Sequence, residues 1–179
     1  FGGAADTGDL HNDLHVFSFA AQQWGSPVHK GQAPSPRKGH ASVVLDDVMY
    51  MFGGSDGEQV LNDCYELHLP NWTWAVVPPS EQTPSPRCYH TLSVHHKSFF
   101  LYGGSEDGEA FVDETSLFKF NVANKEWRLL SSTSTLQAHC AHVFGDSLFL
   151  VGKNVSSRLN EVFEFQFFDR CWLAASLPD

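Results

Sequence analysis

The sequence lacks several features that mark common functional classes. Basic residues are scarce, with 11 lysines and arginines against 21 aspartates and glutamates and a formal net charge of −10. A nucleic-acid partner is therefore not expected, because phosphate backbones need clustered basic residues. No apolar run approaches the roughly 20 residues of a membrane helix, so membrane insertion is not expected either. Basic proteins or peptides are the more natural partners of such a chain.

Helical patterning is also missing. No segment shows a convincing 3.6-residue apolar period, which is the mark of an amphipathic helix. The composition, 42% hydrophobic and 18% charged, is ordinary for a globular chain and argues against disorder. We therefore expect a folded, all-β protein.

The cysteines form no C-x-x-C pair that would suggest a zinc or dithiol site. The four are Cys64, Cys88, Cys140 and Cys171. They fit a reducing compartment, and a cytoplasmic location is predicted. Their even number keeps disulfides possible, and residues 71–73 and 154–156 match the N-glycosylation pattern, so an extracellular location stays open, as does a nuclear one. The chain opens at Phe1 rather than Met, so any targeting segment would lie upstream.

What the sequence does contain is a repeat of about 50 residues. FGG stands at 1–3 and 52–54, YGG at 102–104, and a decayed VGK at 151–153. The phrase PSPR begins at 34 and again at 84. Tryptophans follow the glycines by roughly 20 residues, at Trp24, Trp74, Trp127 and Trp172. Fixed spacing of this kind marks a repeated supersecondary unit, present here in four copies.

Each unit reads as four strands. ASVVL at 41–45 and VMYMF at 48–52 are split by Asp46 and Asp47, which predicts a tight hairpin of two strands buried on both faces. The third strand alternates, which predicts a wetter face at Glu66. The fourth strand carries the tryptophan. Such sheets cannot bury their own surfaces and must stack on neighbouring copies, and radial stacking gives a β-propeller. We expect 41–45, 91–94 and 141–144 to be innermost.

At these residues the chain resembles the kelch-repeat family. The signature of a glycine pair, an aromatic residue and a tryptophan stands in full as Gly53, Gly54, Tyr65 and Trp74, and PSPR with R-x-x-H resembles the longer kelch subtype. The resemblance implies a kelch-type β-propeller of about three and a half four-stranded antiparallel blades. A partial blade covers 1–33, and further blades cover 34–83, 84–134 and 135–179. Kelch propellers usually close with about five to seven blades, so the remaining blades are expected from the full-length chain.

Two kinds of repeated residue are assigned to the blade structure. The signature residues are Gly53, Gly54, Gly103, Gly104, Tyr65, Trp24, Trp74, Trp127, Trp172, His40, His90 and His139. The tryptophans and the phenylalanine-rich runs, including Phe168, are predicted to be core. Recurrence of the histidines favours a structural role, such as an interblade hydrogen bond. The fourth copy departs from the pattern, because Lys153 replaces the second glycine and its loop cannot copy the others if they use positive φ.

The loops after the glycine pairs are the candidate partner-binding face. Chain direction places them on one face with the segments that precede PSPR, and in kelch proteins that face commonly holds the partner. The first three loops carry 11 of the 21 acidic residues and no lysine or arginine. The candidates are Asp56, Glu58, Glu106, Asp107 and Glu109, which form either an electronegative rim that steers a basic partner or solvated turns.

Arg37 and Arg87 complete the set of candidate residues. They begin the innermost strands, near the mouth of the central channel, where a guanidinium could grip a carboxylate of a partner peptide. Equally, each arginine could tie neighbouring blades together through backbone carbonyls or the adjacent acidic loops.

No catalytic constellation is found, so the chain is not expected to be an enzyme and no cofactor or metal is predicted. His139 and His142, the nearest pair of ligands, point to opposite faces of a strand. The predicted function is a protein–protein interaction module, a scaffold or adaptor that docks a partner protein or peptide. It could serve as a ubiquitin-ligase substrate receptor or as a cytoskeletal or trafficking scaffold. The alternatives are an appended or regulatory domain of a larger enzyme, and an extracellular kelch module.

Overall fold

The computed structural model describes residues 1–107, 115–133, 136–154 and 160–175. Within these ranges every regular element is a β-strand, which confirms the all-β prediction. The strands are β1 (Gly3–Ala4), β2 (Leu10–His11), β3 (Val16–Ser18), β4 (Gln23–Gly25), β5 (Lys30–Gly31), β6 (Ala41–Leu45), β7 (Val48–Ser55), β8 (Val60–His68), β9 (Thr73–Val77), β10 (Thr91–His95), β11 (Ser98–Tyr102), β12 (Thr115–Asn121), β13 (Glu126–Thr133), β14 (Leu136–Phe144), β15 (Ser147–Asn154), β16 (Asn160–Gln166) and β17 (Cys171–Ala175).

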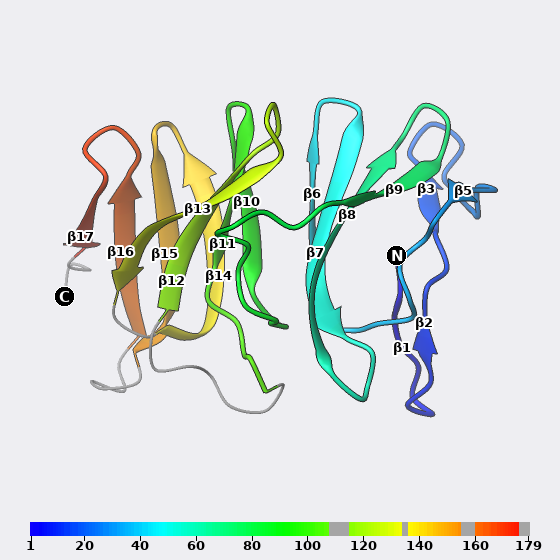
Figure 1. The fold of residues 1–179 in the computed structure, drawn as a ribbon, viewed down its shortest axis with the longest axis horizontal. Helices are drawn as coiled ribbons and strands as arrows, with labels where there is room; N and C mark the ends of the chain where they lie inside the picture. The colour runs from blue at the N-terminus through cyan, green and yellow to red at the C-terminus, as the bar shows by residue number, and fades with distance from the viewer. Residues whose placement is uncertain (108–114, 134–135, 155–159, 176–179) are drawn as a thin grey trace.

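The strands form antiparallel sheets that stand side by side along the molecule (Figure 1). Blade 2 is β6–β9, blade 3 is β10–β13 and blade 4 is β14–β17, each paired in chain order. Blade 1 consists of two short hairpins, β1–β2 and β3–β4. The arrangement is the expected one of three full blades and a partial one.

The first two strands of each full blade are joined by the predicted tight turn. In blade 2 the pairing of β6 with β7 runs to Leu45 and Val48, so only Asp46 and Asp47 make the turn. Asp46 adopts a φ of 54°, and His96 and Gly145 adopt φ values of 52° and 59° at the same turn position of blades 3 and 4. The hairpin is therefore repeated with one backbone geometry, which brings equivalent turn residues to one edge of the molecule.

The first strands lie next to one another. Strand β10 contacts β6 of blade 2 and β14 of blade 4. The hydroxyl of Ser93 on β10 donates to the carbonyl oxygen of Ala141 on β14 at 3.2 Å. Adjacency of the first strands across three blades is the arrangement expected for the innermost strands of a propeller.

The core lies between blades rather than within them. On β7, Tyr50 and Phe52 pack into a cluster with Phe99 of blade 3, whereas Met51 packs into a cluster with Leu14 of blade 1. Successive residues of one strand point to opposite faces, so a strand covered on both faces needs an unbroken apolar run. This explains the continuous apolar sequences of the second strands.

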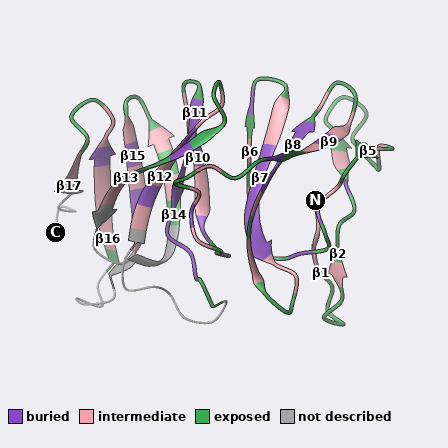
Figure 2. Cartoon of the chain, in the orientation of Figure 1, coloured by how far each residue is buried: buried purple, intermediate pink, exposed green. Residues whose placement is uncertain are grey.

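Strand β11 repeats this alternation toward blades 2 and 4. Phe99 and Leu101 join the cluster with blade 2, and Phe100 and Tyr102 join the cluster that contains Leu148 of blade 4. All five residues of β11 are buried. Figure 2 shows the same pattern, with burial along the middle strands and exposure at the turns.

Three tryptophans pack against an aromatic residue of the preceding blade. That residue stands immediately before the glycine pair, and the ring centroids are 5.1 Å apart for Phe1–Trp74, 5.1 Å for Phe52–Trp127 and 5.9 Å for Tyr102–Trp172. The 50-residue spacing of the two signature elements thus reflects one interblade contact, made once at each boundary between blades.

Trp24 and Phe168 correct the prediction that these aromatic residues are core. Trp24 is 71% exposed and packs on Phe17 of its own hairpin. Phe168 is 92% exposed because it lies in the turn between β16 and β17 rather than in a strand.

The two signature glycines make room for two different neighbours. Gly53 has a φ of 62°, and a Cβ placed on it would lie 2.5 Å from the carbonyl oxygen of Arg87 in blade 3. Gly54 has a φ of 95°, and its Cβ would lie 2.8 Å from the carbonyl oxygen of Lys38 in the same blade. The missing side chain of the first glycine therefore lets the backbone of the next blade pack closely. That of the second glycine lets the segment before the first strand of its own blade pack closely. Both glycines have φ values that other residues rarely adopt.

The fourth blade departs from this pattern as expected. Strand β15 stays paired through Lys153, with Gln137 on β14 and with Asn160 on β16. In blade 2, by contrast, β6 pairs with β7 only as far as Phe52, and Gly54 is paired with β8 alone.

Two features were not anticipated. The segment between blades 1 and 2 contributes a fifth short strand, β5, which pairs in parallel with β9. In addition, Glu66 on the face expected to be wetter is only 6% exposed. Lys125 of blade 3 donates to both of its carboxylate oxygens, at 2.8 and 2.9 Å. Strand β8 is therefore covered on both faces from Cys64 to Leu67, whereas His68 at its end is exposed.

Candidate functional site

Arg37 is completely buried, and its own blade uses every donor of its side chain. Nη1 donates to the carbonyl oxygen of Gly53 at 2.9 Å and to Asp63 Oδ1 at 2.6 Å, and Nη2 donates to Asp63 Oδ2 at 2.9 Å. Ser35 accepts the remaining two bonds, at its carbonyl oxygen from Nε and at its hydroxyl from Nη2. A guanidinium has five N–H groups, and these bonds engage all five.

The backbone of Arg37 is bonded to blade 1. Its N–H donates to the carbonyl oxygen of His11 at 3.1 Å, and its carbonyl oxygen accepts from the N–H of Gly3 at 2.9 Å. The main chain of Arg37 is bonded to blade 1 and its side chain is bonded to blade 2, so this residue links the two blades. This geometry favours the structural alternative over a grip on a partner's carboxylate.

Arg87 repeats the arrangement one blade later. Its backbone bonds to blade 2 through Leu61 and Gly54, and its Nη1 donates to the carbonyl oxygen of Gly103 at 2.9 Å. Among the described residues its carboxylate partner is Glu106, which is half exposed and whose Oε1 lies 3.4 Å from Nη2. Burial lowers the pKa of the Arg87 guanidinium. Asp113, which corresponds in sequence to Asp63, lies outside the described residues.

The signature histidines pack between blades. The ring of His40 meets Phe1 edge-on with centroids 5.6 Å apart, and the ring of His90 meets Phe52 at 5.5 Å. Burial, helped by nearby positive charges, lowers the pKa of His40 to about 4, so this ring is neutral at pH 7. The side chain of His139 lies outside the described residues.

Asp56 is a turn residue in the loop after the second glycine pair. Its Oδ1 accepts from the backbone N–H groups of Glu58 at 3.0 Å and Gln59 at 2.9 Å. These bonds to the ionised carboxylate lower the pKa of Asp56. For this carboxylate the geometry therefore supports the simpler interpretation, a turn that organises its own loop.

The other acidic candidates differ in how much of their charge faces solvent. Glu58 is exposed. Glu106 accepts from the hydroxyl of Ser85 as well as approaching Arg87, and Asp107 accepts from the hydroxyl of Ser105 at 2.9 Å. Glu109 lies outside the described residues.

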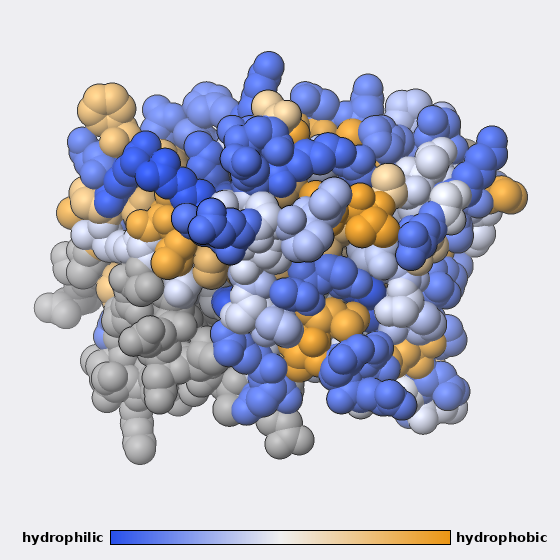
Figure 3. Space-filling model, viewed as in Figure 1, coloured by the Kyte–Doolittle hydropathy of each residue, from blue (hydrophilic) through white to orange (hydrophobic). Residues whose placement is uncertain are grey.

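The post-glycine loops after β1 and β7 lie at one edge of the molecule, the lower edge in Figure 1. We call this edge the loop face, and the opposite edge with the tight turns the turn face. Asp6 in the first loop and Glu58 in the second are both exposed, and the exposed Lys38 lies beside the second loop through its pairing with Ser55. Viewed as in Figure 3, hydrophobic atoms show as separate patches among hydrophilic ones rather than as one continuous surface.

The buried cysteines offer no reactive thiol. All four are free, and Cys64 and Cys88 are buried. Burial raises the pKa of both buried thiols, which keeps them in the unreactive protonated form.

One group of metal-ligating side chains occurs among the described residues, and it lies on the turn face. It comprises His95, His96 and Asp146, none of which the sequence analysis singled out. Their positions in the chain gave no signal, because Asp146 comes from the next blade, about 50 residues away.

Comparison with known proteins places these features in a family. A model of the KLHDC2/KLHL20/DRC7 Kelch-repeats domain matches residues 1–178. Kelch domain-containing protein 1 of Homo sapiens is 41% identical over 64 residues, which are 35% of this chain and 16% of that protein. The leucine-zipper-like transcriptional regulator 1 homolog of Drosophila melanogaster is 36% identical over 77 residues, covering 38% of this chain and 8% of that protein. Acyl-CoA-binding domain-containing protein 5 of Arabidopsis thaliana is 43% identical over 51 residues, covering 28% of this chain and 8% of that protein.

The matched segments thus span 16% or less of each of these relatives. Among the described residues, no helix is long and apolar enough to cross a membrane.

Proposed function

Since the chain belongs to the KLHDC2/KLHL20/DRC7 Kelch-repeats family, we propose that it is a protein-interaction module that docks a partner protein on its loop face. Kelch-repeat domains are generally non-catalytic modules that bind proteins. The proposal for this chain is finer, because it names the face and the charge of the partner.

The observation that carries the proposal is the exposure of carboxylates on consecutive loops. Asp6 and Glu58 belong to neighbouring loops, and both are exposed. The two loops lie near each other, since a Cβ built on Gly57 would lie 3.5 Å from Leu10 Cδ1 of blade 1. Like charges held close together on a rigid scaffold create a local negative potential, which attracts a basic segment of a partner.

Arg37 and Arg87 have a supporting role in this proposal. Their buried guanidinium groups hold the blades from which the loops project, and Arg87 also lies within 3.4 Å of Glu106. These contacts hold the base of the loops in place, which reduces the conformational entropy that the loops lose when a partner binds.

The face can be tested by site-specific photo-crosslinking in the full-length protein. A photoreactive residue in place of Glu58 should capture the partner, whereas the same residue in place of Asp47 on the turn face should not. Both positions are exposed, so the pair controls for nonspecific capture. Equal capture from the two positions, or capture only from the turn face, would contradict the proposed face.

The charge can be tested by association kinetics with the captured partner. The double variant Asp6→Asn with Glu58→Gln should slow association and weaken its salt dependence, because rim charges act mostly on encounter. Each exposed pair contributes only about 0–1 kcal/mol, so affinity should fall by at most roughly thirtyfold. The matched control is Asp47→Asn with Asp169→Asn on the turn face, which makes the same change in net charge. Equal effects of the two double variants would leave the acidic loops as solvated turns.

Within this proposal the chain acts as a scaffold or adaptor. The substrate receptor of a ubiquitin ligase and a cytoskeletal or trafficking scaffold are both compatible with such a module. The named relatives support a modular context, because one of them also contains an acyl-CoA-binding domain by its name.

A further inference from the structure

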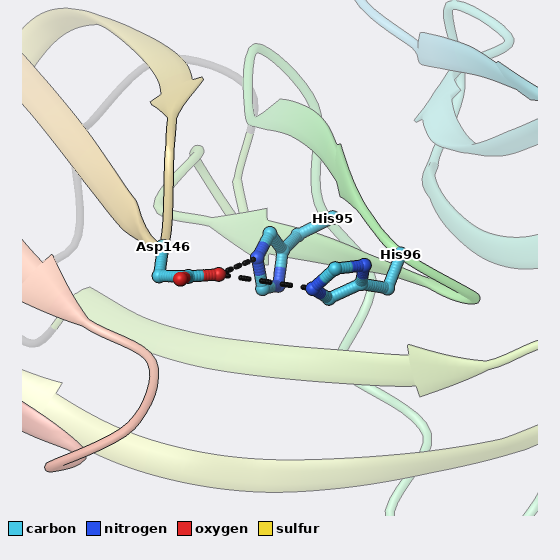
Figure 4. Close-up of side chains that lie close together, drawn as sticks. All are labelled: His95, His96 and Asp146. Atoms are coloured by element: carbon cyan, nitrogen blue, oxygen red, sulfur yellow. Dashed lines mark hydrogen bonds and ion pairs between the residues drawn. The ribbon is translucent and has the colours of Figure 1, made fainter.

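The turn face brings together side chains from two blades. His95 ends β10, His96 occupies the first position of the turn that follows, and Asp146 occupies the second position of the equivalent turn in blade 4. Figure 4 shows the carboxylate of Asp146 directed at both imidazole rings. The repeat itself creates this meeting, because equivalent turns of adjacent blades lie side by side.

The distances suit a tetrahedral metal ion. The Nε2 atom of His95 lies 3.0 Å from Asp146 Oδ1, and the Nε2 atom of His96 lies 3.7 Å from the same oxygen. One ligand atom from each of the three residues lies within 4.8 Å of the others. Ligands about 2.0–2.1 Å from a tetrahedral ion are about 3.3 Å from one another, so the two measured distances bracket the ideal value.

Phe167 holds two of the three ligands in place. Its ring stacks on the ring of His95 with centroids 4.1 Å apart and planes at 15°. Its backbone N–H donates to the carbonyl oxygen of Asp146 at 3.0 Å. Residues that orient ligands in this way raise metal affinity, because less ordering is needed on binding.

The exposure of the cluster leaves room for a fourth ligand. The His95 side chain is 14% exposed, whereas those of His96 and Asp146 are each 78% exposed. The two histidines also border a groove of about 580 Å³ between blades 3 and 4, which Phe167 lines as well. Water or a donor atom of a bound molecule can therefore reach the ion.

We propose that His95, His96 and Asp146 bind a Zn²⁺ ion that joins blade 3 to blade 4. Two imidazole nitrogens and one carboxylate oxygen are ligands that zinc accepts in open tetrahedral sites. The hydrogen bond between His95 and Asp146 can form without a metal, but it does not explain why the ring of His96 also lies beside the same carboxylate. The third ligand is therefore what separates a metal site from a simple interblade hydrogen bond.

The test uses the full-length protein, stripped of metal with a chelator and titrated calorimetrically with Zn²⁺. One ion per chain should bind at this site, and Co²⁺ in its place should give the intense visible absorption of tetrahedral coordination. His96→Gln and Asp146→Asn should each weaken Zn²⁺ binding at least about tenfold, because each removes one of three ligands. The melting midpoint of the wild type should rise with Zn²⁺.

The matched control is His142→Gln, which removes an exposed histidine of β14 outside the cluster. It should leave Zn²⁺ binding unchanged. Circular dichroism spectra of the three metal-free variants should match that of the wild type, since His96 and Asp146 are exposed. Binding that survives His96→Gln, or that falls equally with His142→Gln, would show scattered histidine binding and overturn the proposal, as would the absence of Zn²⁺ binding.

Discussion

Replacement of Arg37 by alanine should destabilise the protein strongly. The substitution removes a fully buried cation together with its two bonds to Asp63, one to the carbonyl of Gly53 and two to Ser35. It also leaves the Asp63 carboxylate, whose side chain is 32% exposed, without its counter-ion.

The expected cost follows from these contacts. Breaking a buried ion pair by removing one partner typically costs about 3–5 kcal/mol. In a domain of this size 1 kcal/mol corresponds to about 2–4 °C in melting midpoint, so Arg37→Ala should lower the midpoint by roughly 6–20 °C. Arg37→Lys should keep the charge but lose the forked pairing with Asp63, and so recover only part of the stability.

The assay is thermal and urea unfolding of the full-length protein carrying Arg37→Ala, Asp63→Ala or both. Because Arg37 and Asp63 share two hydrogen bonds, the double variant should be less destabilised than the sum of the two single variants. An unchanged midpoint for Arg37→Ala, combined with lost partner binding, would refute the structural role and restore the partner-binding one.

Three further outcomes follow from the interblade contacts. Gly53→Ala should lower the melting midpoint by disrupting the contact between blades 2 and 3, because its Cβ would lie 2.5 Å from a backbone oxygen. Gly145→Ala, whose Cβ would have nothing within 4 Å, should cost only the backbone strain of positive φ. Equal melting midpoints of the two variants would contradict this. The folded pKa of His40, about 4, lies below the ordinary value of 6.5, so its contribution to stability should be present above pH 6.5 and lost toward pH 4. His40→Gln should flatten that part of the pH–stability curve. Residues 1–179 expressed alone should self-associate in sedimentation experiments through exposed aromatic residues such as Trp24 and Phe144; a cooperatively folding monomer would contradict this expectation.

Much of the fold could be predicted from the sequence because its determinants are local and periodic. The apolar runs of β7 and β11 fixed strands buried on both faces, and Asp46 with Asp47 fixed the tight turn. The glycine pairs and tryptophans set the period. Each of these signals depends on the chemistry of a few neighbouring residues, and repetition made it visible without any knowledge of tertiary contacts.

The candidate site was less predictable, because it depends on which partner each side chain finds. From the sequence, Arg37 could either bind a carboxylate of a partner or link neighbouring blades. Only the fold showed that Asp63, Gly53 and Ser35 surround its guanidinium. Alternation predicted a wetter face at Glu66, yet Lys125 of the next blade donates to its carboxylate.

By itself, the sequence determined that this protein is a repeated all-β chain whose post-glycine loops are rich in acidic residues, because strand period, turn residues and charge are properties of short segments. Only the tertiary structure decided which charges are available. The guanidinium groups of Arg37 and Arg87 are buried and hydrogen-bonded within the blades, whereas Glu58 is exposed to solvent. Asp146 lies close to His95 and His96. The physical reason is that stacking places residues about 50 positions apart within hydrogen-bonding distance, and no local pattern encodes which side chains will meet there.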